Sequence, residues 1–382
     1  MRRNPSVSAN PFKAAQASAE HWGLAAKALI DGLSPFPEGA NLGFVYVSQD
    51  FADELSSIVT LLKETTPVSQ WFGAAGYGVL GPQGTQRQGS AIVALVGRIE
   101  VGGVLPLEGF DPETADEFRR THAAWLTGQN AVAGLVHGNP RDPDLVDMIS
   151  GLSDIADAYL MGGLTLSCDN PVQVAHRLTS SGLSGLLLGD SVPLAVGITQ
   201  GCHPIGPPHL VTEAVDNVVM GLDGRPALEV LKTEAGEVIA RNLSRAAGYI
   251  HVALPIEGSD NVHDYAVRNL MGIDPKRGWI AVGDRMLSGE RMMFVRRDPN
   301  AAQRDMARML NGLKQRLNGQ NPKGGLYFCC QQRGAAMFGT DGRELELIHE
   351  VLGDFPLVGF NASGEICHDR LYGYTGVLAL FI

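Results

Sequence analysis

The segment CQQRG at residues 330–334 contains the side chains with the clearest potential for chemistry. Arg333 carries a planar guanidinium, which suits two-pronged recognition of a carboxylate. The same positive charge would lower the pKa of a nearby thiol, such as that of Cys330, and activate it as a nucleophile. The alternative is a cysteine that only fills a buried strand, followed by a surface arginine and the turn residue Gly334. The residues alone leave both interpretations open.

A second polar segment, NASGE at residues 361–365, follows an apolar run at residues 357–360. It presents Asn361, Ser363 and Glu365 in a small turn that contains glycine. Glu365 is suited to a ligand's ammonium group, and its alternative role is that of a solvated turn acid. Polar groups thus follow two apolar strands, where a rigid scaffold can aim them at a ligand. We therefore expect a binding site around these two segments.

Two features of the cysteines bear on an enzyme interpretation. Cys329 and Cys330 are adjacent, and because side chains alternate across a strand, at most one of them faces a site. The segment CHD at residues 367–369 suggests a nucleophile beside a base, but sequence neighbours seldom form such pairs, and we interpret it as a turn. An enzyme with Cys330 as nucleophile would need a histidine within hydrogen-bond reach of its sulfur.

Nucleotide and metal motifs give little support to other functions. GYGVLG at residues 76–81 matches GxGxxG, but Pro82 and a strand follow it where a dinucleotide site needs a helix. We interpret it as a glycine turn whose Gly76 and Tyr77 line the binding site. No HExxH motif or carboxylate cluster indicates a metal enzyme. His203 and His209 lie in a linker, where a histidine can ligate haem iron or have no role.

The composition excludes several classes of protein. The net charge is −11 and no dense Lys/Arg cluster exists, which argues against nucleic-acid binding. No segment reaches the roughly 18–20 apolar residues of a membrane span. The first residues lack a hydrophobic region behind their arginines, so we expect no signal peptide. The five cysteines are odd in number and match no metal module, which favours a reduced, cytoplasmic protein.

The elements that must position these residues follow a repeated order. Residues 326–330 and 357–360 are apolar enough for buried strands, and residues 345–352 between them show a helical pattern. The same order of strand, helix, strand, glycine turn and strand occurs at residues 42–96 and, more loosely, from residue 131 onward. A recurring supersecondary unit indicates a fold built from packed copies.

We therefore predict an α/β fold of the mixed α+β type, with repeated strand-helix-strand-strand units and mixed sheets flanked by helices. The Pro/Gly-rich segment at residues 200–208 marks a domain boundary, which gives two similar domains at residues 1–205 and 206–382. Apolar residues at helical spacing from Phe12 to Leu29 predict a docking helix over residues 10–32.

The chain resembles the FIST-domain proteins, a sensory family with an N-terminal and a C-terminal half. The C-terminal resemblance rests on CQQRG at residues 330–334, GFNASGEI at residues 359–366 and YGYT at residues 372–375. The N-terminal half is similar through residues 44–48 and 73–79. The resemblance implies a small-ligand sensor, with amino acids the ligands usually proposed. Some members resemble haem-binding nitric-oxide sensors that act on partner signalling enzymes.

The leading hypothesis is a cytoplasmic ligand-binding sensor that needs no cofactor and signals through a separate protein such as a kinase or cyclase. Arg333 would hold a carboxylate, and Asn361 and Glu365 would hold polar groups such as an ammonium. One alternative is a haem-binding nitric-oxide sensor, with His203 or His209 as axial ligand. The other is an enzyme with Cys330 as nucleophile. The candidate ligand-binding residues are Gly76, Tyr77, Cys330, Arg333, Gly334, Asn361, Ser363 and Glu365.

Overall fold

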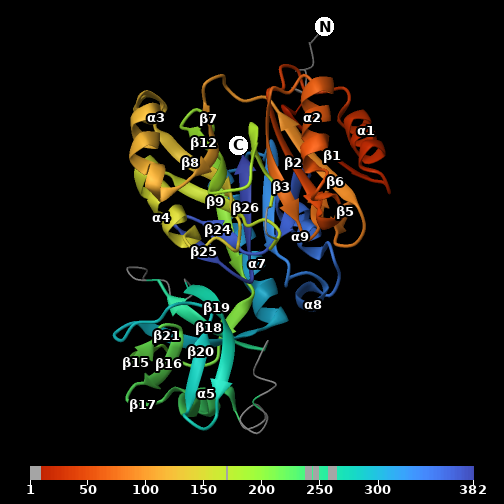
Figure 1. Cartoon of the computed structure of the whole chain (residues 1–382). Coiled ribbons are helices and arrows are strands. Elements are labelled where there is room, and N and C mark those ends of the chain that lie inside the picture. Colours follow the sequence, from red (N-terminus) through yellow and green to blue (C-terminus); the bar gives the residue numbers. More distant parts are fainter. Residues whose placement is uncertain (1–9, 169–170, 237–242, 244–248, 257–264) are drawn as a thin grey trace. The chain divides into compact units, whose positions relative to one another are not determined.

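Figure 1 shows a computed structural model of the chain, which describes residues 10–168, 171–236, 243, 249–256 and 265–382. The chain forms two compact units. The first comprises Met1–Thr199, Met306–Leu371 and Thr375–Ile382, and the second comprises Gln200–Asp305 with Tyr372–Tyr374. The domain boundary expected between residues 205 and 206 stays a prediction. Among the helices that the structure describes, none is long and apolar enough to cross a membrane.

The first unit contains three copies of one structural repeat. Copy 1 consists of β1 (Phe12–Ser18), α1 (Trp22–Leu33), β2 (Leu42–Ser48), α2 (Leu55–Thr65), β3 (Gln70–Gly76), β4 (Val79–Gly81), β5 (Gly84–Gln86) and β6 (Ala91–Gly97). Copy 2 consists of β7 (Val104–Phe110), α3 (Ala115–Gln129), β8 (Ala131–His137), α4 (Leu145–Ala156), β9 (Tyr159–Gly163), β10 (Gln173–Ala175), β11 (Arg177–Thr179) and β12 (Leu183–Gly189). Copy 3 consists of β13 (Leu194–Gln200), α7 (Pro299–Leu317), β22 (Gly324–Cys330), α8 (Ala335–Phe338), α9 (Arg343–Leu352), β23 (Leu357–Ala362), β24 (Glu365–Cys367), β25 (Arg370–Tyr372) and β26 (Thr375–Phe381).

Strand pairing follows the same rule in each copy, which confirms the predicted repeat and the mixed α+β fold. The two strands on either side of the central helix pair in parallel, as β2 and β3, β8 and β9, and β22 and β23. A helix between them is needed because parallel strands require a crossover connection. The last strand of each copy pairs antiparallel with the first strand of this pair. Strands β2, β22 and β26 are buried along their whole length.

A glycine at the same place in each copy makes the parallel pair possible. A Cβ on Gly73, Gly162 or Gly359 would lie only 1.7, 1.8 or 1.8 Å from a carbonyl oxygen of the partner strand. A side chain larger than a hydrogen therefore cannot occupy this position without displacing the strand. The three sheets share this close backbone approach, which fixes their register in the same way.

The three copies exchange their hairpins in a ring. The hairpin β4–β5 of copy 1 extends the sheet of copy 3 by pairing with β23, and β10–β11 of copy 2 pairs with β3 of copy 1. The hairpin β24–β25 of copy 3 completes the ring by pairing with β9 of copy 2. Each of the three six-stranded sheets therefore contains strands from two copies.

Aromatic rings occupy the centre of the ring of copies. Tyr46, His137 and Phe328 occupy equivalent positions in the three copies. Each comes directly after the residue that pairs with the close-approach glycine of its copy. Their ring centroids lie 5.5 Å (Tyr46–His137), 6.0 Å (Tyr46–Phe328) and 5.7 Å (His137–Phe328) apart. Burial lowers the pKa of His137 to about 4, so this ring is neutral and serves packing.

The second unit lies in the chain between β13 and α7 and is built differently. Its strands β15 (His209–Val215), β16 (Val218–Leu222), β20 (Trp279–Val282), β19 (Tyr265–Asp274), β18 (Ile250–Pro255) and β21 (Arg291–Arg297) form a closed antiparallel barrel. The helix α5 (Ala227–Ala235) contacts β16 and β20, while β14 (Cys202–Pro204) and β17 (Arg225–Pro226) extend two of the barrel strands. These elements are coloured green to cyan in Figure 1.

The N-terminal prediction differs from the structure. Residues 10–32 were expected to form one docking helix, but Phe12–Ser18 form the edge strand β1, which pairs with β6, and only Trp22–Leu33 are helical. The helical spacing was genuine only from Trp22 onward. In β1 the apolar residues are mostly alanines, and their spacing is compatible with both the helical period of 3.6 residues and the strand period of 2. Pairing with β6 therefore decides that this segment is a strand.

Candidate functional site

The two predicted segments follow the neighbouring parallel strands β22 and β23, so they emerge at the same edge of one sheet. Cys330 at the end of β22 lies opposite Ala362 at the end of β23. The turn after β22 leads through α8 into α9, and the turn after β23 leads into β24. The fold thus brings the two segments together as the sequence predicted.

Arg333 forms a buried ion pair with Glu344 at the start of α9. Its Nε and Nη2 atoms each lie 2.8 Å from Glu344 Oε1, and its guanidinium stacks 4.9 Å from the centre of the Phe338 ring. Both charged residues are nearly inaccessible, at 3% and 6% exposed. The carboxylate that Arg333 contacts in the structure therefore comes from the protein itself.

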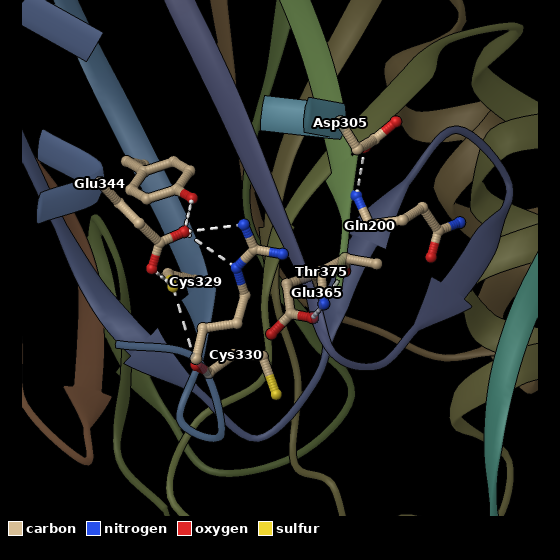
Figure 2. A network of polar contacts seen from close by, with 9 residues as sticks. Gln200, Asp305, Cys329, Cys330, Glu344, Glu365 and Thr375 are labelled. Atoms are coloured by element: carbon tan, nitrogen blue, oxygen red, sulfur yellow. Dashed lines mark hydrogen bonds and ion pairs between the residues drawn. The ribbon is translucent and has the colours of Figure 1, made fainter. Parts of the chain in front are cut away.

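Glu344 also accepts hydrogen bonds from two side chains of β22. Tyr327 Oη lies 2.7 Å from Oε1, and Cys329 Sγ lies 3.3 Å from Oε2. Burial, followed by the charge of Glu344, raises the pKa of the Cys329 thiol well above its usual range, so this thiol stays protonated. Burial alone would lower the pKa of Arg333, but Glu344 outweighs this effect and raises it. Figure 2 shows Glu344 and Cys329 with these contacts as dashed lines.

Sequence reasoning missed Glu344. The signal that marks it is its place on the apolar face of α9, four residues before Ile348, where the other buried positions are Leu345 and Leu352. An acidic residue on such a face is rarely fully buried without a partner. The periodicity therefore indicates a partner, but it does not identify Arg333.

Cys330 is buried, and its carbonyl oxygen accepts a hydrogen bond of 2.9 Å from the Arg333 amide. Gly334 next to it has φ of +95°, a conformation that favours glycine, and a Cβ there would lie 2.6 Å from Arg87 Nη2. Gly334 therefore serves the turn and lets Arg87 approach. The thiol beside the ion pair is that of Cys329, and a nucleophilic role of Cys330 stays a prediction.

Glu365 is the second buried carboxylate, and its hydrogen bonds are incomplete. Its Oε2 accepts bonds from Thr375, at 3.2 Å from the backbone nitrogen and 2.7 Å from Oγ1. Its Oε1 is buried and has no hydrogen-bond partner in the part of the chain that the structure describes. Burial raises the pKa of Glu365 to about 8, so the carboxyl group is largely protonated at neutral pH. Figure 2 shows Glu365 beside Thr375.

Asn361 is fully buried and also lacks side-chain partners. Its backbone is bound to the glycine turn of copy 1, because its amide donates to Gly78 O and its carbonyl accepts from Tyr77 N, both at 2.9 Å. Neither Oδ1 nor Nδ2 has a hydrogen-bond partner among the described residues. Gly76 and Gly78 let the two turns approach, since a Cβ on them would lie 2.4 Å from Phe360 and 2.9 Å from Asn361 Oδ1.

The remaining predicted residues have local partners. Ser363 Oγ donates to Thr165 O at 2.7 Å, and Tyr77 Oη accepts a long bond of 3.4 Å from Ser167 N. Asn361, Gly76 and Tyr77 therefore meet where the turns of copies 1 and 3 join. Glu365 lies within electrostatic reach of Arg333, whose charge lowers the carboxyl pKa against the larger effect of burial.

The histidines of the haem alternative lie in the second unit. His209 has both ring nitrogens engaged, with Nδ1 2.6 Å from Asp223 Oδ2 and Nε2 2.6 Å from Glu234 Oε1. Burial alone would lower its pKa, but the two carboxylates raise it. A histidine held in this way does not fit the role of an iron ligand. His203 lies exposed on β14. In the described part of the chain, no group of three or more His, Cys, Asp or Glu residues could hold a metal.

One hollow of the first unit lies away from these residues. A hollow of about 1090 Å³ is lined by the start of β1, the loop after β6, and the end of β26 with Lys323. None of the predicted site residues lines it. Asn361 and Glu365 are each fully buried, so a ligand that reached either side chain would be small and surrounded by protein.

The fold and this centre define a mixed α+β protein with two buried carboxylates, one of them only partly hydrogen bonded. Comparison with family models identifies the class more closely. The chain matches the FIST N domain over residues 41–225 and the FIST C domain over residues 227–368. It therefore belongs to the FIST family, as its sequence motifs predicted. FIST domains are associated with sensory signalling and the binding of small ligands.

The curated relatives that the chain matches carry the name of uncharacterized proteins. The chain is 36% identical over 217 residues to the uncharacterized protein Rv0628c of Mycobacterium tuberculosis, which covers 53% of this chain and 54% of the relative. It is 34% identical over 221 residues to the uncharacterized protein Mb0898c of Mycobacterium bovis, which covers 54% and 55%. The matched region thus spans about half the length of each relative.

Proposed function

We propose that this protein is a cytoplasmic sensor whose ligand, an amino acid or a small carboxylate, binds at Asn361 and Glu365. The observation that carries the proposal is that three buried polar atoms of these two residues, Asn361 Oδ1, Asn361 Nδ2 and Glu365 Oε1, have no hydrogen-bond partner among the described residues. Buried polar atoms are rarely left unpaired, because each costs about 1–3 kcal/mol. A bound small molecule, directly or through water, would satisfy them.

The chemistry of these atoms fits an amino acid. Glu365 would accept a hydrogen bond from the ligand's ammonium group at Oε1 and ionise as the cation arrives, while the amide of Asn361 can both donate and accept. Arg333 lies within electrostatic reach of Glu365. Its positive charge favours a ligand carboxylate nearby, in addition to the Glu344 carboxylate that it already contacts.

The output of the sensor would pass to a separate signalling protein such as a kinase or cyclase. This part of the proposal is supported by the family's association with sensory signalling. The second unit is a compact barrel with its own hydrophobic core, and it would be the part of the chain that a partner contacts.

The test is a thermal-shift and calorimetric screen with amino acids, small carboxylates and haemin. A ligand at a hundred times its Kd adds about 2.7 kcal/mol of stability, and each kcal/mol moves the Tm by roughly 2–4 °C in domains of this size. We expect one amino acid or small carboxylate to raise the Tm. If neither amino acids nor small carboxylates raise the Tm, the ligand assignment is wrong. A Soret band with haemin, in the absence of any other response, would support the haem alternative instead.

Substitution of Glu365 locates the site. Glu365→Gln removes the carboxylate with little change of shape, so we expect the affinity for the active ligand to fall at least about tenfold, which is 1.4 kcal/mol. The matched control is Glu346→Gln, which makes the same substitution at a side chain of α9 that is 61% exposed. Equal affinities of Glu365→Gln and Glu346→Gln would place the ligand elsewhere.

A further inference from the structure

Thr375 and Tyr374 are consecutive residues that make their contacts in different compact units. Thr375 begins β26 of the first unit, whereas Tyr374 belongs to the second unit. We propose that this residue pair couples the two units, so that a change at Glu365 is passed through Thr375 to Tyr374 and the barrel strands β18 and β19. The inference rests on the proposed ligand site, because a ligand at Glu365 would produce the change.

Thr375 is attached to Glu365 by two hydrogen bonds. The Glu365 Oε2 atom accepts from both the backbone nitrogen and the Oγ1 atom of Thr375, which is fully buried. The backbone amide is one of the two donors, so the position of the main chain at Thr375 depends directly on this carboxyl group.

Tyr374 is attached to the barrel by three contacts. Its Oη donates to Asn269 Oδ1 at 2.6 Å, its ring centroid lies 4.4 Å from that of His251, and the guanidinium of Arg297 lies 5.7 Å from the ring centre. His251 of β18 and Asn269 of β19 are direct partners across the two strands. Movement of Tyr374 would therefore act on both strands at one point.

The backbone between these two attachments is in a costly conformation. Tyr374 has φ of +62°, which lies in the left-handed region that a bulky residue rarely adopts. Such a conformation persists only where the surrounding contacts enforce it. The contacts of Thr375 on one side and of the Tyr374 ring on the other meet this condition, so a change in either set alters the balance at this residue.

The coupling follows from the charge of Glu365. While the carboxyl group is neutral, Oε2 accepts ordinary hydrogen bonds from Thr375. When a cationic group binds at Oε1, the carboxylate ionises and both bonds become charge-assisted, which makes them shorter and stronger. Thr375 is then drawn toward Glu365, and the peptide link transmits the displacement to Tyr374.

Other titratable groups face each end of this element. Arg333, Glu344 and Cys329 interact electrostatically with Glu365. These groups belong to the first unit, and their influence on Tyr374 would also pass through Glu365.

At the other end, His251 and Arg297 lie close to Tyr374, which packs against a core cluster that includes Cys202. Burial lowers the pKa of His251 to about 4, so its ring stays neutral from pH 6 upward. Arg297 keeps its charge at every pH used below. The variants below change Glu365 or Thr375 and leave Cys202 in place, so they distinguish an effect of Glu365 from an effect of Cys202.

The test uses NMR of the full chain with ring-13C-labelled tyrosine, without any ligand. The chain has eight tyrosines, and the signal of Tyr374 is assigned by its loss in Tyr374→Phe. We expect this signal to shift between about pH 6 and about pH 9, with a midpoint near the Glu365 pKa of about 8. The shift should disappear in Glu365→Gln, decrease in Thr375→Val and return in Thr375→Ser.

The other tyrosine signals report whether each variant is folded. A Tyr374 shift that persists unchanged in folded Glu365→Gln would assign it to Cys202 or another group and overturn the coupling. A Tyr374 signal that does not move with pH in the wild type would do the same. Because no ligand is used, the coupling can fail while the ligand screen succeeds, and the screen can fail while the coupling is observed.

Discussion

Glu344 and Glu365 are two buried carboxylates of the same unit, and their surroundings differ. Glu344 is bound by a guanidinium, a phenol and a thiol, which together serve both of its oxygens. Glu365 is bound at Oε2 by Thr375 alone, and its Oε1 has no partner among the described residues. Both oxygens of Glu344 thus accept hydrogen bonds from the protein, whereas one oxygen of Glu365 has no hydrogen-bond partner among the described residues.

This difference separates a group that stabilises the fold from one that can respond to a ligand. A buried charge that is fully hydrogen bonded holds its neighbours in one arrangement. A buried group with an unpaired atom is costly, and proteins retain such groups where a ligand, water or proton completes them. The sequence made Arg333 the main ligand-binding residue. In the structure Arg333 contacts Glu344, and its role in ligand binding stays a prediction, whereas Asn361 and Glu365 have polar atoms without a partner among the described residues.

The largest effect is expected from breaking the Glu344 ion pair. Arg333→Ala leaves a buried carboxylate without its cation, which should cost about 3–5 kcal/mol of unfolding free energy. The double variant Arg333→Met with Glu344→Leu removes both charges and should recover most of this loss. Urea unfolding of the first unit measures both. A stable Arg333→Ala single variant would show that Glu344 does not depend on this pair.

The pH dependence of stability should come from Glu365. Its folded pKa is raised from 4.5 to about 8, so the folded state keeps a proton that the unfolded state has released. The stability that this group contributes is fully present below about pH 4.5 and is lost as the pH rises through about 8. The loss should be on the order of 1 kcal/mol per pH unit within this window.

Glu365→Gln is the control for this titration, since an amide does not ionise. The difference in unfolding free energy between wild type and Glu365→Gln should therefore become less favourable to the wild type from pH 5 to pH 8. Thermal unfolding at several pH values measures this difference. Parallel profiles for the two proteins would show that Glu365 does not titrate as described.

A hydrogen bond to the satisfied carboxylate should be worth more than an average one. Tyr327→Phe removes the phenol that lies 2.7 Å from Glu344 Oε1. Because the acceptor is charged and buried, the variant should lose about 1.5–3 kcal/mol of stability. Tyr46→Phe is a matched control, since the Tyr46 hydroxyl makes only a long contact of 3.4 Å to His137. Equal losses in the two variants would contradict the special status of Glu344.

The smallest expected effect is a gain in stability at the unsatisfied centre. Asn361→Leu replaces an amide without partners by an apolar side chain of similar size, which should be neutral or stabilise the protein by about 1 kcal/mol. The same variant should abolish binding of the active ligand. A Tm measurement with and without ligand tests both effects. A loss of several kcal/mol would show that Asn361 has a structural partner.

The strands and turns of the site could be predicted because their signals are local. Residues 326–330 and 357–360 are short apolar runs, and the glycine turns after them are visible in the sequence. The partners could not be predicted in the same way. Glu344 lies 11 residues from Arg333, within a helix whose rotation decides whether it faces the strand. Thr375 reaches Glu365 only because β26 returns beside β22.

The same limit explains the N-terminal error. Alanine-rich residues 12–18 satisfy helical and extended periods equally, and β1 becomes a strand because the long-range edge of β6 is available to pair with it. The three copies, in contrast, were recognisable because the order strand, helix, strand, glycine turn and strand recurs over continuous segments, at residues 42–96, from residue 131 and from residue 326.

The ring of exchanged hairpins also determines when the protein can fold. The sheet of copy 2 is completed only when β24 pairs with β9. Ser363 donates a hydrogen bond to Thr165 across this junction, and the two residues are 198 positions apart in the sequence. Such high contact order predicts slow folding, and a nascent chain emerging from the ribosome leaves the edge of β9 open until β24 has been made. Termination of translation before β24 would therefore yield an aggregation-prone fragment in which the edge of β9 is exposed.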